Sequence, residues 1–245
     1  MTRGAIIVGA SSGIGAALAR ELADEGYQIG LAARRTERMR QIGSELPTKS
    51  YVATMDLLDP EDAREGFFEL AEAMPAVDLV VISAGVAAMN PDLEWDAERR
   101  TIDVNVRGFT AIATAALEYF ENYPDHASEA DGHLVGISSV AAHLGTGGTQ
   151  AYNASKAYVS RYLEGLRHRQ QHRDADVTIT TIEPGFVDTD LSMGGFWECS
   201  PETAAEQIAG AIRKEKNHAY VTRRWRLVVW ALALLPESIR RRLLS

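Results

Sequence analysis

The stretch Ala5–Gly15 reads AIIVGASSGIG and joins an apolar run to a glycine-rich turn. The run Ala5–Val8 has the fully apolar character of a strand that is buried on both faces of a sheet. Glycines let the backbone approach a pyrophosphate closely, and a helix that starts there offers free N–H groups and its positive dipole end. We therefore predict a strand, a phosphate-binding turn and a helix; the alternative is a tight turn that binds nothing. The turn residues expected to contact a dinucleotide are Gly9, Ser11, Ser12, Gly13, Ile14 and Gly15.

Apolar runs alternate with helical patterns along most of the chain, which predicts a parallel sheet with helices on both faces. We expect an α/β fold, a single-domain, Rossmann-type, doubly wound parallel sheet of about seven strands. It spans residues 1–222, and a basic and apolar tail at 223–245 is either part of it or peripheral. The expected strands are Ala5–Val8, Gln28–Ala33, Ser50–Thr54, Val77–Ser83, His133–Ser138, Val177–Glu183 and Ala219–Thr222. The expected helices are Ile14–Glu25, Arg35–Leu46, Pro60–Glu72, Asp96–Tyr123, Ala151–Gln171 and Pro201–Lys216.

Composition and charge exclude some classes of function. The chain has 245 residues, of which 46% are apolar and 24% charged, and its net charge is −9. Residues 213–245 carry nine Lys and Arg against two Glu, a balance of +7, which leaves −16 for residues 1–212. So acidic a body repels nucleic acid, and we expect no nucleic-acid partner. Cys199 is the only cysteine and the chain shows no signal peptide, so we expect a reducing compartment and a cytoplasmic protein.

Three residues in the middle of the chain are candidates for catalysis. Tyr152 and Lys156 stand four residues apart in a predicted helix, so they share one face of it. An unperturbed tyrosine has a pKa of about 10, and a nearby ammonium favours the phenolate and lowers that pKa. Tyr152 could then exchange a proton near neutral pH. Ser139 follows a predicted strand, where its hydroxyl can donate to a carbonyl oxygen that gains charge.

Together, the GASSGIG turn, the Tyr152-xxx-Lys156 pair and Ser139 resemble the short-chain dehydrogenase/reductase family in its compact single-domain form. The resemblance covers about Gly4 to Thr189. It implies that Asn105 is the fourth member of a catalytic tetrad, where it bends its helix and holds a water that passes protons to the lysine. Read from the residues alone, Asn105 is a helix-surface residue. The resemblance also implies a homodimer or homotetramer formed through the predicted helices Asp96–Tyr123 and Ala151–Gln171.

The same resemblance implies further contacts with a nicotinamide dinucleotide. An Asp-hydrophobic pair after the third strand meets the adenine ring, and a Pro-Gly segment with a following threonine contacts the nicotinamide carboxamide. The fourth strand ends in Ser83-Ala84-Gly85 where the family usually has Asn-Asn-Ala-Gly, which loses amide hydrogen bonds but keeps space for the ribose. The residues concerned are Asp56, Leu57, Ala84, Gly85, Tyr152, Lys156, Pro184, Gly185, Val187 and Thr189.

The second strand ends in Ala33-Arg34-Arg35, and this favours NADP(H) over NAD(H). An enzyme for NAD places an acidic side chain here, where it binds the ribose 2′-hydroxyl. A guanidinium instead suits the 2′-phosphate of NADP in charge and in fork geometry. The alternative is that Arg34 and Arg35 simply begin a solvated helix.

The substrate is expected to be apolar. The segment Leu191–Ser200 combines apolar side chains with two glycines and could form a lid, the alternative being an ordinary surface loop. The expected substrate contacts are His143, Met193, Phe196 and Trp197. His168 and His172 share a helix face, but no third ligand accompanies them, so we expect no metal. The nine apolar residues Leu227–Leu235 are too few to span a bilayer; they could lie on an anionic membrane, cap the substrate site or enter an oligomer contact.

These observations predict an oxidoreductase that transfers hydride between NADP(H) and a small-molecule carbonyl compound or secondary alcohol. Two other readings stay open. One is an NADP(H)-binding sensor or scaffold of the same fold that does not turn over. The other is a sugar-nucleotide epimerase or dehydratase, which shares the Tyr-xxx-Lys pair but usually has a different glycine spacing and a longer C-terminal lobe.

Overall fold

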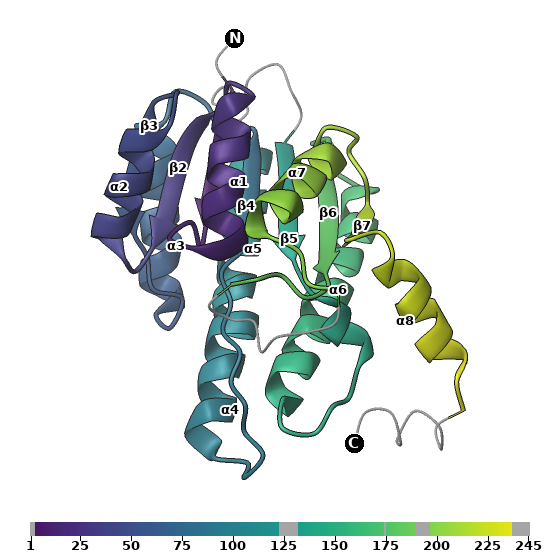
Figure 1. The fold of residues 1–245 in the computed structure, drawn as a ribbon. Coiled ribbons are helices and arrows are strands. Elements are labelled where there is room, and N and C mark those ends of the chain that lie inside the picture. Colours follow the sequence, from purple (N-terminus) through teal and green to yellow (C-terminus); the bar gives the residue numbers. More distant parts are fainter. Residues whose placement is uncertain (1–2, 123–131, 174, 190–196, 237–245) are drawn as a thin grey trace.

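The computed structural model describes residues 3–122, 132–173, 175–189 and 197–236, and in them seven parallel strands form one sheet (Figure 1). The strand order is β3-β2-β1-β4-β5-β6-β7. From β1 the chain winds to one edge, and from β4 it winds to the other. The loops that follow β1 and β4 therefore diverge and leave a crevice in which such sheets bind ligands. The strands are β1 (Gly4–Val8), β2 (Gln28–Ala33), β3 (Ser50–Thr54), β4 (Leu79–Ile82), β5 (Gly132–Ile137), β6 (Val177–Pro184) and β7 (His218–Val221).

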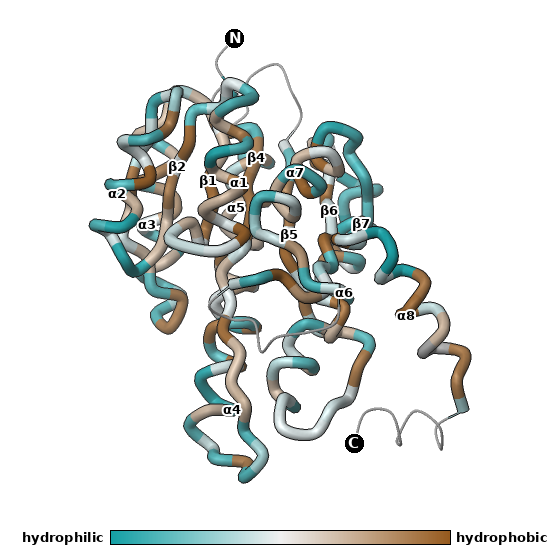
Figure 2. Tube along the Cα trace, viewed as in Figure 1, coloured by the Kyte–Doolittle hydropathy of each residue, from teal (hydrophilic) through white to brown (hydrophobic). Residues whose placement is uncertain are grey.

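Helices cover both faces of the sheet (Figure 1), and most residues of the central strands are hydrophobic (Figure 2) because both faces of the sheet are buried. In β1, Ile6 and Val8 enter one core, while Ala5 and Ile7 enter the other. The first core is closed by α3 (Pro60–Ala73), α5 (Phe109–Asn122) and α6 (Gln150–Gln170). The second is closed by α1 (Gly13–Asp24), α2 (Thr36–Glu45) and α7 (Pro201–Ile212). The predicted fold class is thus confirmed.

The predicted helix Asp96–Tyr123 is continuous but not uniform. It begins as α4 (Trp95–Ile102), passes through a π-helical segment at Asp103–Gly108 and continues as α5. A Cβ on Gly108 would lie 2.5 Å from Cβ of Leu57, so the helix approaches the end of β3 closely. Sequence periodicity did not reveal the π segment, because one wide turn hardly changes the apolar pattern on either side of it.

The predicted tail begins with a helix, α8 (Trp225–Leu234), that the sequence analysis did not assign. Trp225 and Val229 pack against Val140, which lies in the short 3₁₀ helix η3 (Val140–His143) after β5. The opposite side of α8 exposes large apolar side chains, which are Leu227, Trp230 and Leu234. Among the described residues, every helix is too short or too polar to cross a bilayer.

Candidate active site

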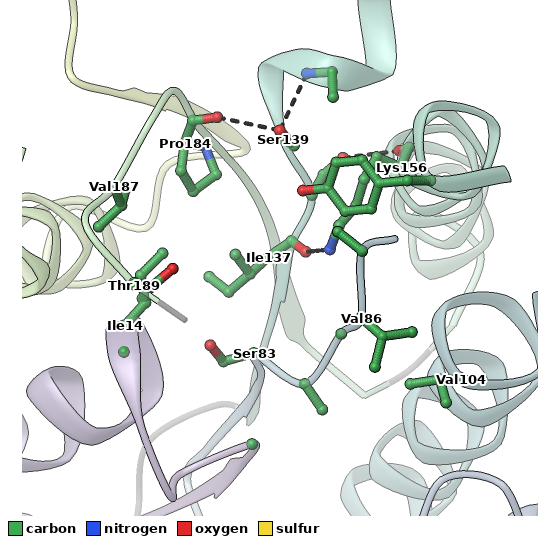
Figure 3. Close-up of a pocket in the computed structure, with 18 of the residues that line it drawn as sticks. Ile14, Ser83, Val86, Val104, Ile137, Ser139, Lys156, Pro184, Val187 and Thr189 are labelled. Carbon is green, nitrogen blue, oxygen red and sulfur yellow. Dashed lines mark hydrogen bonds between the residues drawn. The ribbon is translucent and has the colours of Figure 1, made fainter. Parts of the chain in front are cut away.

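A cavity of about 540 Å³ opens at the carboxyl ends of the strands. Figure 3 shows part of its wall, with Ile14 and Thr189 on one side and Ser139 and Lys156 on the other. Most residues that the sequence analysis selects lie along this wall: Gly9, Ser11, Ser12, Gly13, Ile14, Arg34, Arg35, Asp56, Leu57, Ala84, Gly85, Ser139, Tyr152, Lys156, Pro184, Gly185, Val187 and Thr189. Four others, Gly15, Asn105, His143 and Trp197, do not line it.

The glycines of the turn have different tasks. Gly9 has φ +94°, and a Cβ there would lie 2.5 Å from the backbone nitrogen of Ala84 at the end of β4. A Cβ on Gly15 would lie 2.3 Å from the carbonyl oxygen of Gly9, so Gly15 serves the turn itself rather than the cavity wall. Gly13 has φ +53°, and a Cβ there would lie 3.0 Å from Cγ2 of Thr189. Only glycine combines this conformation with so little space.

The start of α1 is free to bind an anion. The side chain of Ser12, the residue before the helix, makes no capping hydrogen bond, and the first turn contains no acidic residue. Arg35 instead donates from Nε to Oγ of Ser11 at 3.1 Å and from a terminal nitrogen to Oγ of Ser12 at 2.5 Å. Two hydroxyls, a guanidinium and open helix N–H groups thus meet at one point. This set fits the phosphates of a dinucleotide.

Ser139 and Tyr152 form the reactive end of the cavity. Ser139 begins η3, where its Oγ accepts from the backbone N–H of Ala141 at 3.1 Å and donates to the carbonyl of Pro184 at 3.4 Å. Burial raises the pKa of the Tyr152 phenol above its usual value, and a hydrogen bond with Ser139 lowers it again in part. A raised pKa favours the neutral phenol, and a neutral phenol can donate a proton.

Lys156 is buried beside Tyr152, and its ammonium donates to the carbonyl of Ile137 at 3.0 Å (Figure 3). Nζ lies 5.8 Å from the centroid of the Tyr152 ring. Burial lowers the pKa of the Lys156 amine to about 8. The hydrogen bond with Ser139 lowers the pKa of Tyr152 here, and the lowering that the sequence analysis expects from Lys156 stays a prediction.

Asn105 lies in the π-helical segment and is almost fully buried, not on the helix surface. Its Oδ1 accepts from the backbone N–H of Val86 at 2.9 Å, and its Nδ2 donates to the carbonyl of Val86 at 2.8 Å and to Oγ of Ser155 at 3.0 Å. The amide thereby holds the loop after β4 against α6. Gly85 sits in this clamp, since a Cβ there would lie 3.4 Å from both Asn105 Oδ1 and Lys156 Nζ.

None of the predicted substrate contacts is among the described residues that line the cavity. His143 points away from the cavity wall and binds the carboxylate of Glu183 at 2.7 Å. Trp197 does not line the cavity either, but its ring contacts Trp225, which does. Met193 and Phe196 lie outside the described residues. His143 therefore lies outside the lining of this cavity, because a buried carboxylate binds its imidazole, and its contact with a substrate stays a prediction.

Sequence reasoning missed most of the apolar wall near Ser139. That wall consists of Met89, Val140, Leu144, Phe186 and Trp225. Trp225 follows the last strand closely, and the carboxyl ends of the strands in a parallel sheet lie at one edge, where the cavity opens. This position was the signal from which Trp225 could have been found. The sequence analysis missed it because it assigned residues 223–245 to a tail that is either part of the domain or peripheral.

Comparison with known proteins identifies the class. A family model described as short chain dehydrogenase matches residues 3–196. An uncharacterized oxidoreductase of Mycobacterium tuberculosis is 32% identical over 250 residues, which cover 97% of this chain and 95% of the relative. An uncharacterized oxidoreductase of Myxococcus xanthus is 36% identical over 196 residues, or 78% and 74% of the two chains. The chain belongs to the short-chain dehydrogenase/reductase family, whose members bind a nicotinamide cofactor, and it is an oxidoreductase of that class.

Solved structures agree on the fold. An alcohol dehydrogenase from the archaeon Thermococcus sibiricus, complexed with 5-hydroxy-NADP, superimposes with a TM-score of 0.78 at 24% identity, covering 90% of this chain and 96% of that one. A dehydrogenase/reductase from Sinorhizobium meliloti superimposes with a TM-score of 0.73 at 27% identity, covering 86% and 87%.

Proposed function

We propose that this protein transfers hydride between NADP(H) and an apolar carbonyl compound or secondary alcohol. The observation that carries the proposal is a single cavity with phosphate-binding groups at one end and Ser139, Tyr152 and Lys156 at the other. A bound nicotinamide supplies or accepts the hydride. The protein's own residues bind the substrate, hold it in place and exchange the proton.

The preference for NADP(H) rests on the end of β2. Arg34 and Arg35 both line the cavity, and no carboxylate stands between Ala32 and Arg35. Arg35 lies over the hydroxyls of the glycine turn, so its charge is fixed beside the phosphates, while Arg34 is exposed next to it. Two guanidinium groups would stabilise a bound 2′-phosphate and would contribute little to the binding of a 2′-hydroxyl.

Tyr152 is the acid in carbonyl reduction. Its neutral phenol gives a proton to the carbonyl oxygen as that oxygen gains charge, and Ser139 donates a second hydrogen bond to the same oxygen. Lys156 would bind the ribose hydroxyls of the cofactor and, together with the positively charged oxidised nicotinamide, favour the phenolate in the reverse direction. Asn105 acts as a positioning residue. We also propose that it holds a water molecule through which protons pass to Lys156.

The substrate end of the cavity supports an apolar compound. Its wall holds one thioether, two aliphatic and two aromatic side chains, from Met89, Val140, Leu144, Phe186 and Trp225. Apolar pockets with few polar groups select by shape and place the reactive group through those few. Ser139 and Tyr152 are the polar groups next to this wall. We further propose a homo-oligomer formed through α4, α5 and α6.

The test is NADPH consumption against a panel of aldehydes, ketones and quinones, repeated with Tyr152→Phe. The substitution keeps the ring and removes only the hydroxyl, so we expect a loss of about 10²-fold to 10⁴-fold in kcat/KM. Tyr158→Phe is the matched control, because Tyr158 lies on the same helix and its hydroxyl pairs with Thr110 instead. Unchanged activity in Tyr152→Phe would remove Tyr152 as the acid.

A sensor or scaffold that binds NADP(H) without turnover is the second candidate. It would bind NADPH with the same affinity in the original protein and in Tyr152→Phe, and it would oxidise none across the panel. The intact set of Ser139, Tyr152 and Lys156 at the cavity wall argues against this reading, since cofactor binding alone needs no proton donor.

A further inference from the structure

Glu183, the residue before Pro184, is a charged group that the proposed reaction does not use. Its side chain is 2% exposed and lies at the end of β6. One carboxylate oxygen binds Nε2 of His143 at 2.7 Å and Nε2 of His218 at 3.2 Å. The other accepts from Oγ of Ser160 at 2.8 Å. Burial alone would raise the pKa of this carboxyl, but these hydrogen bonds outweigh burial and lower the pKa to about 2.

The partners of Glu183 come from different elements. His143 ends η3, Ser160 lies in α6 and His218 begins β7, and each is tied to β6 by the one carboxylate. A hydrogen bond to a charged group is roughly twice as strong as one between neutral groups. Glu183 is therefore the point at which four elements of the active-site edge are held together.

The network continues to the backbone of the catalytic residues. Ser160 donates its hydroxyl hydrogen to Glu183, and its Oγ lies 2.7 Å from Oγ of Ser138. Ser138 Oγ also lies 2.8 Å from the carbonyl of Lys156, so Ser160 and Lys156 share the one hydroxyl hydrogen of Ser138 as acceptors. Ser138 directly precedes Ser139, and Ser139 reaches the carbonyl of Pro184, the residue after Glu183.

We propose that Glu183 is a positioning residue that fixes the hydroxyl of Ser139 relative to Tyr152 and Lys156. This inference rests on the proposed function, because it assigns Ser139 and Tyr152 their roles there. The carboxylate does not touch the cavity, so it acts only through the elements that it joins. It links Ser138, which directly follows β5, to α6 through Ser160, and it holds η3, of which Ser139 is the N-cap residue, through His143.

This role has a consequence for the pH dependence of the reaction. The hydrogen bond between Ser139 and Tyr152 lowers the pKa of Tyr152, so displacement of Ser139 removes that lowering. The ionisable groups around Glu183 are His143 from η3, His218 and Tyr220 from β7, and Arg161 from α6. None of them is among the groups that shift the pKa of Tyr152, and Nζ of Lys156 lies 5.8 Å from the centroid of the Tyr152 ring.

Glu183→Gln tests the inference, since it keeps the size of the side chain and removes its charge. We measure kcat/KM for a carbonyl substrate against pH at saturating NADPH, together with the dissociation constant of NADPH. We expect kcat to fall roughly 10-fold to 100-fold. The alkaline pKa of the profile should rise by about 0.4 to 1 unit, the worth of one hydrogen bond. NADPH affinity should stay within about twofold of the original, because the phosphate end of the cavity is untouched.

Two further variants separate positioning from stability. Ser160→Ala breaks one link at lower risk to folding and should shift the pKa in the same direction by less. His133→Gln is the matched control, because His133 is buried in β5 and pairs with Thr180 of β6 at 2.8 Å, away from the cavity. His133→Gln should lower the free energy of unfolding and leave the pKa values of the pH profile unchanged. If Glu183→Gln and Ser160→Ala reduce the rate equally at every pH with no shift, the inference is wrong. The proposed function would still stand as long as Tyr152→Phe is inactive.

Discussion

Gly185 and Trp225 are packed so closely that a Cβ on Gly185 would lie 1.8 Å from Nε1 of the indole. The two residues come from the segment after β6 and from the first turn of α8. Trp225 is buried, and the described part of the chain offers its Nε1 no acceptor. The glycine at position 185 is thus required by the packing of α8, whatever it contributes to cofactor binding.

Gly185→Ala should therefore expel Trp225 from the cavity wall. We expect the free energy of unfolding to fall by about 1–3 kcal/mol, as in other overpacked sites. Urea denaturation followed by tryptophan fluorescence measures both effects. Gly210→Ala is the control, because it lies within α7 and the nearest atom to its added Cβ is 3.6 Å away. It should stabilise the helix by roughly 0.5–1 kcal/mol. Equal stability of the two variants would contradict the packing argument.

The two arginines after β2 should decide the choice of cofactor. Arg34→Ala and Arg35→Ala should each weaken NADPH binding by about 10-fold to 100-fold, the worth of one charged hydrogen bond. NADH binding should change little in Arg34→Ala, because NADH lacks the 2′-phosphate. Arg35→Ala should also weaken NADH binding, because Arg35 lies at the turn that would bind the phosphates common to both cofactors. Titration of protein fluorescence with each cofactor measures this. Arg40→Ala is the control, since Arg40 is exposed on α2 and pairs with Glu37. Tighter binding of NADH than NADPH by the original protein would overturn the assignment.

The ion pair of Glu183 should make stability depend on pH in a predictable direction. The pKa of Glu183 is lowered from 4.5 to about 2, so the unfolded chain takes up the proton first as the pH falls. The contribution of Glu183 to the free energy of unfolding is on the order of 3 kcal/mol. It is fully present above about pH 4.5 and disappears as the pH approaches 2. The pKa of His143 is raised by the same bond, so that stabilisation is present below pH 6.5 and is lost as the pH rises through the raised value.

Urea unfolding at pH 3, 5 and 7 checks this prediction against Glu183→Gln. The difference in unfolding free energy between the two proteins should be larger at pH 5 than at pH 3. A difference that is the same at both values would show that the charge of Glu183 does not stabilise the fold.

The sheet and the glycine turn were predictable because their signals are local. Apolar runs and helical periods give the strands and helices one by one, and the turn Gly9–Gly15 marks the switch between β1 and α1. The wall formed by Trp225 was not predictable, because it depends on where α8 packs. The orientation of His143 also depends on a residue 40 positions away, Glu183, and no spacing rule connects the two.

Asn105 offers the sharpest test of the link between helix geometry and the site. Asn105→Ala leaves the N–H and carbonyl of Val86 without partners, and we expect a loss of about 2–5 kcal/mol in unfolding free energy. The loop after β4 would then no longer be held beside Lys156, so kcat should fall even where the protein is fully folded. Thr101→Val is the control, because Thr101 is buried one turn earlier and its hydroxyl binds only the carbonyl of Ala97 among the described contacts. Calorimetry and kcat under folded conditions measure the two effects. If Asn105→Ala lowers stability but retains full kcat, the amide holds the fold and has no part in positioning Lys156.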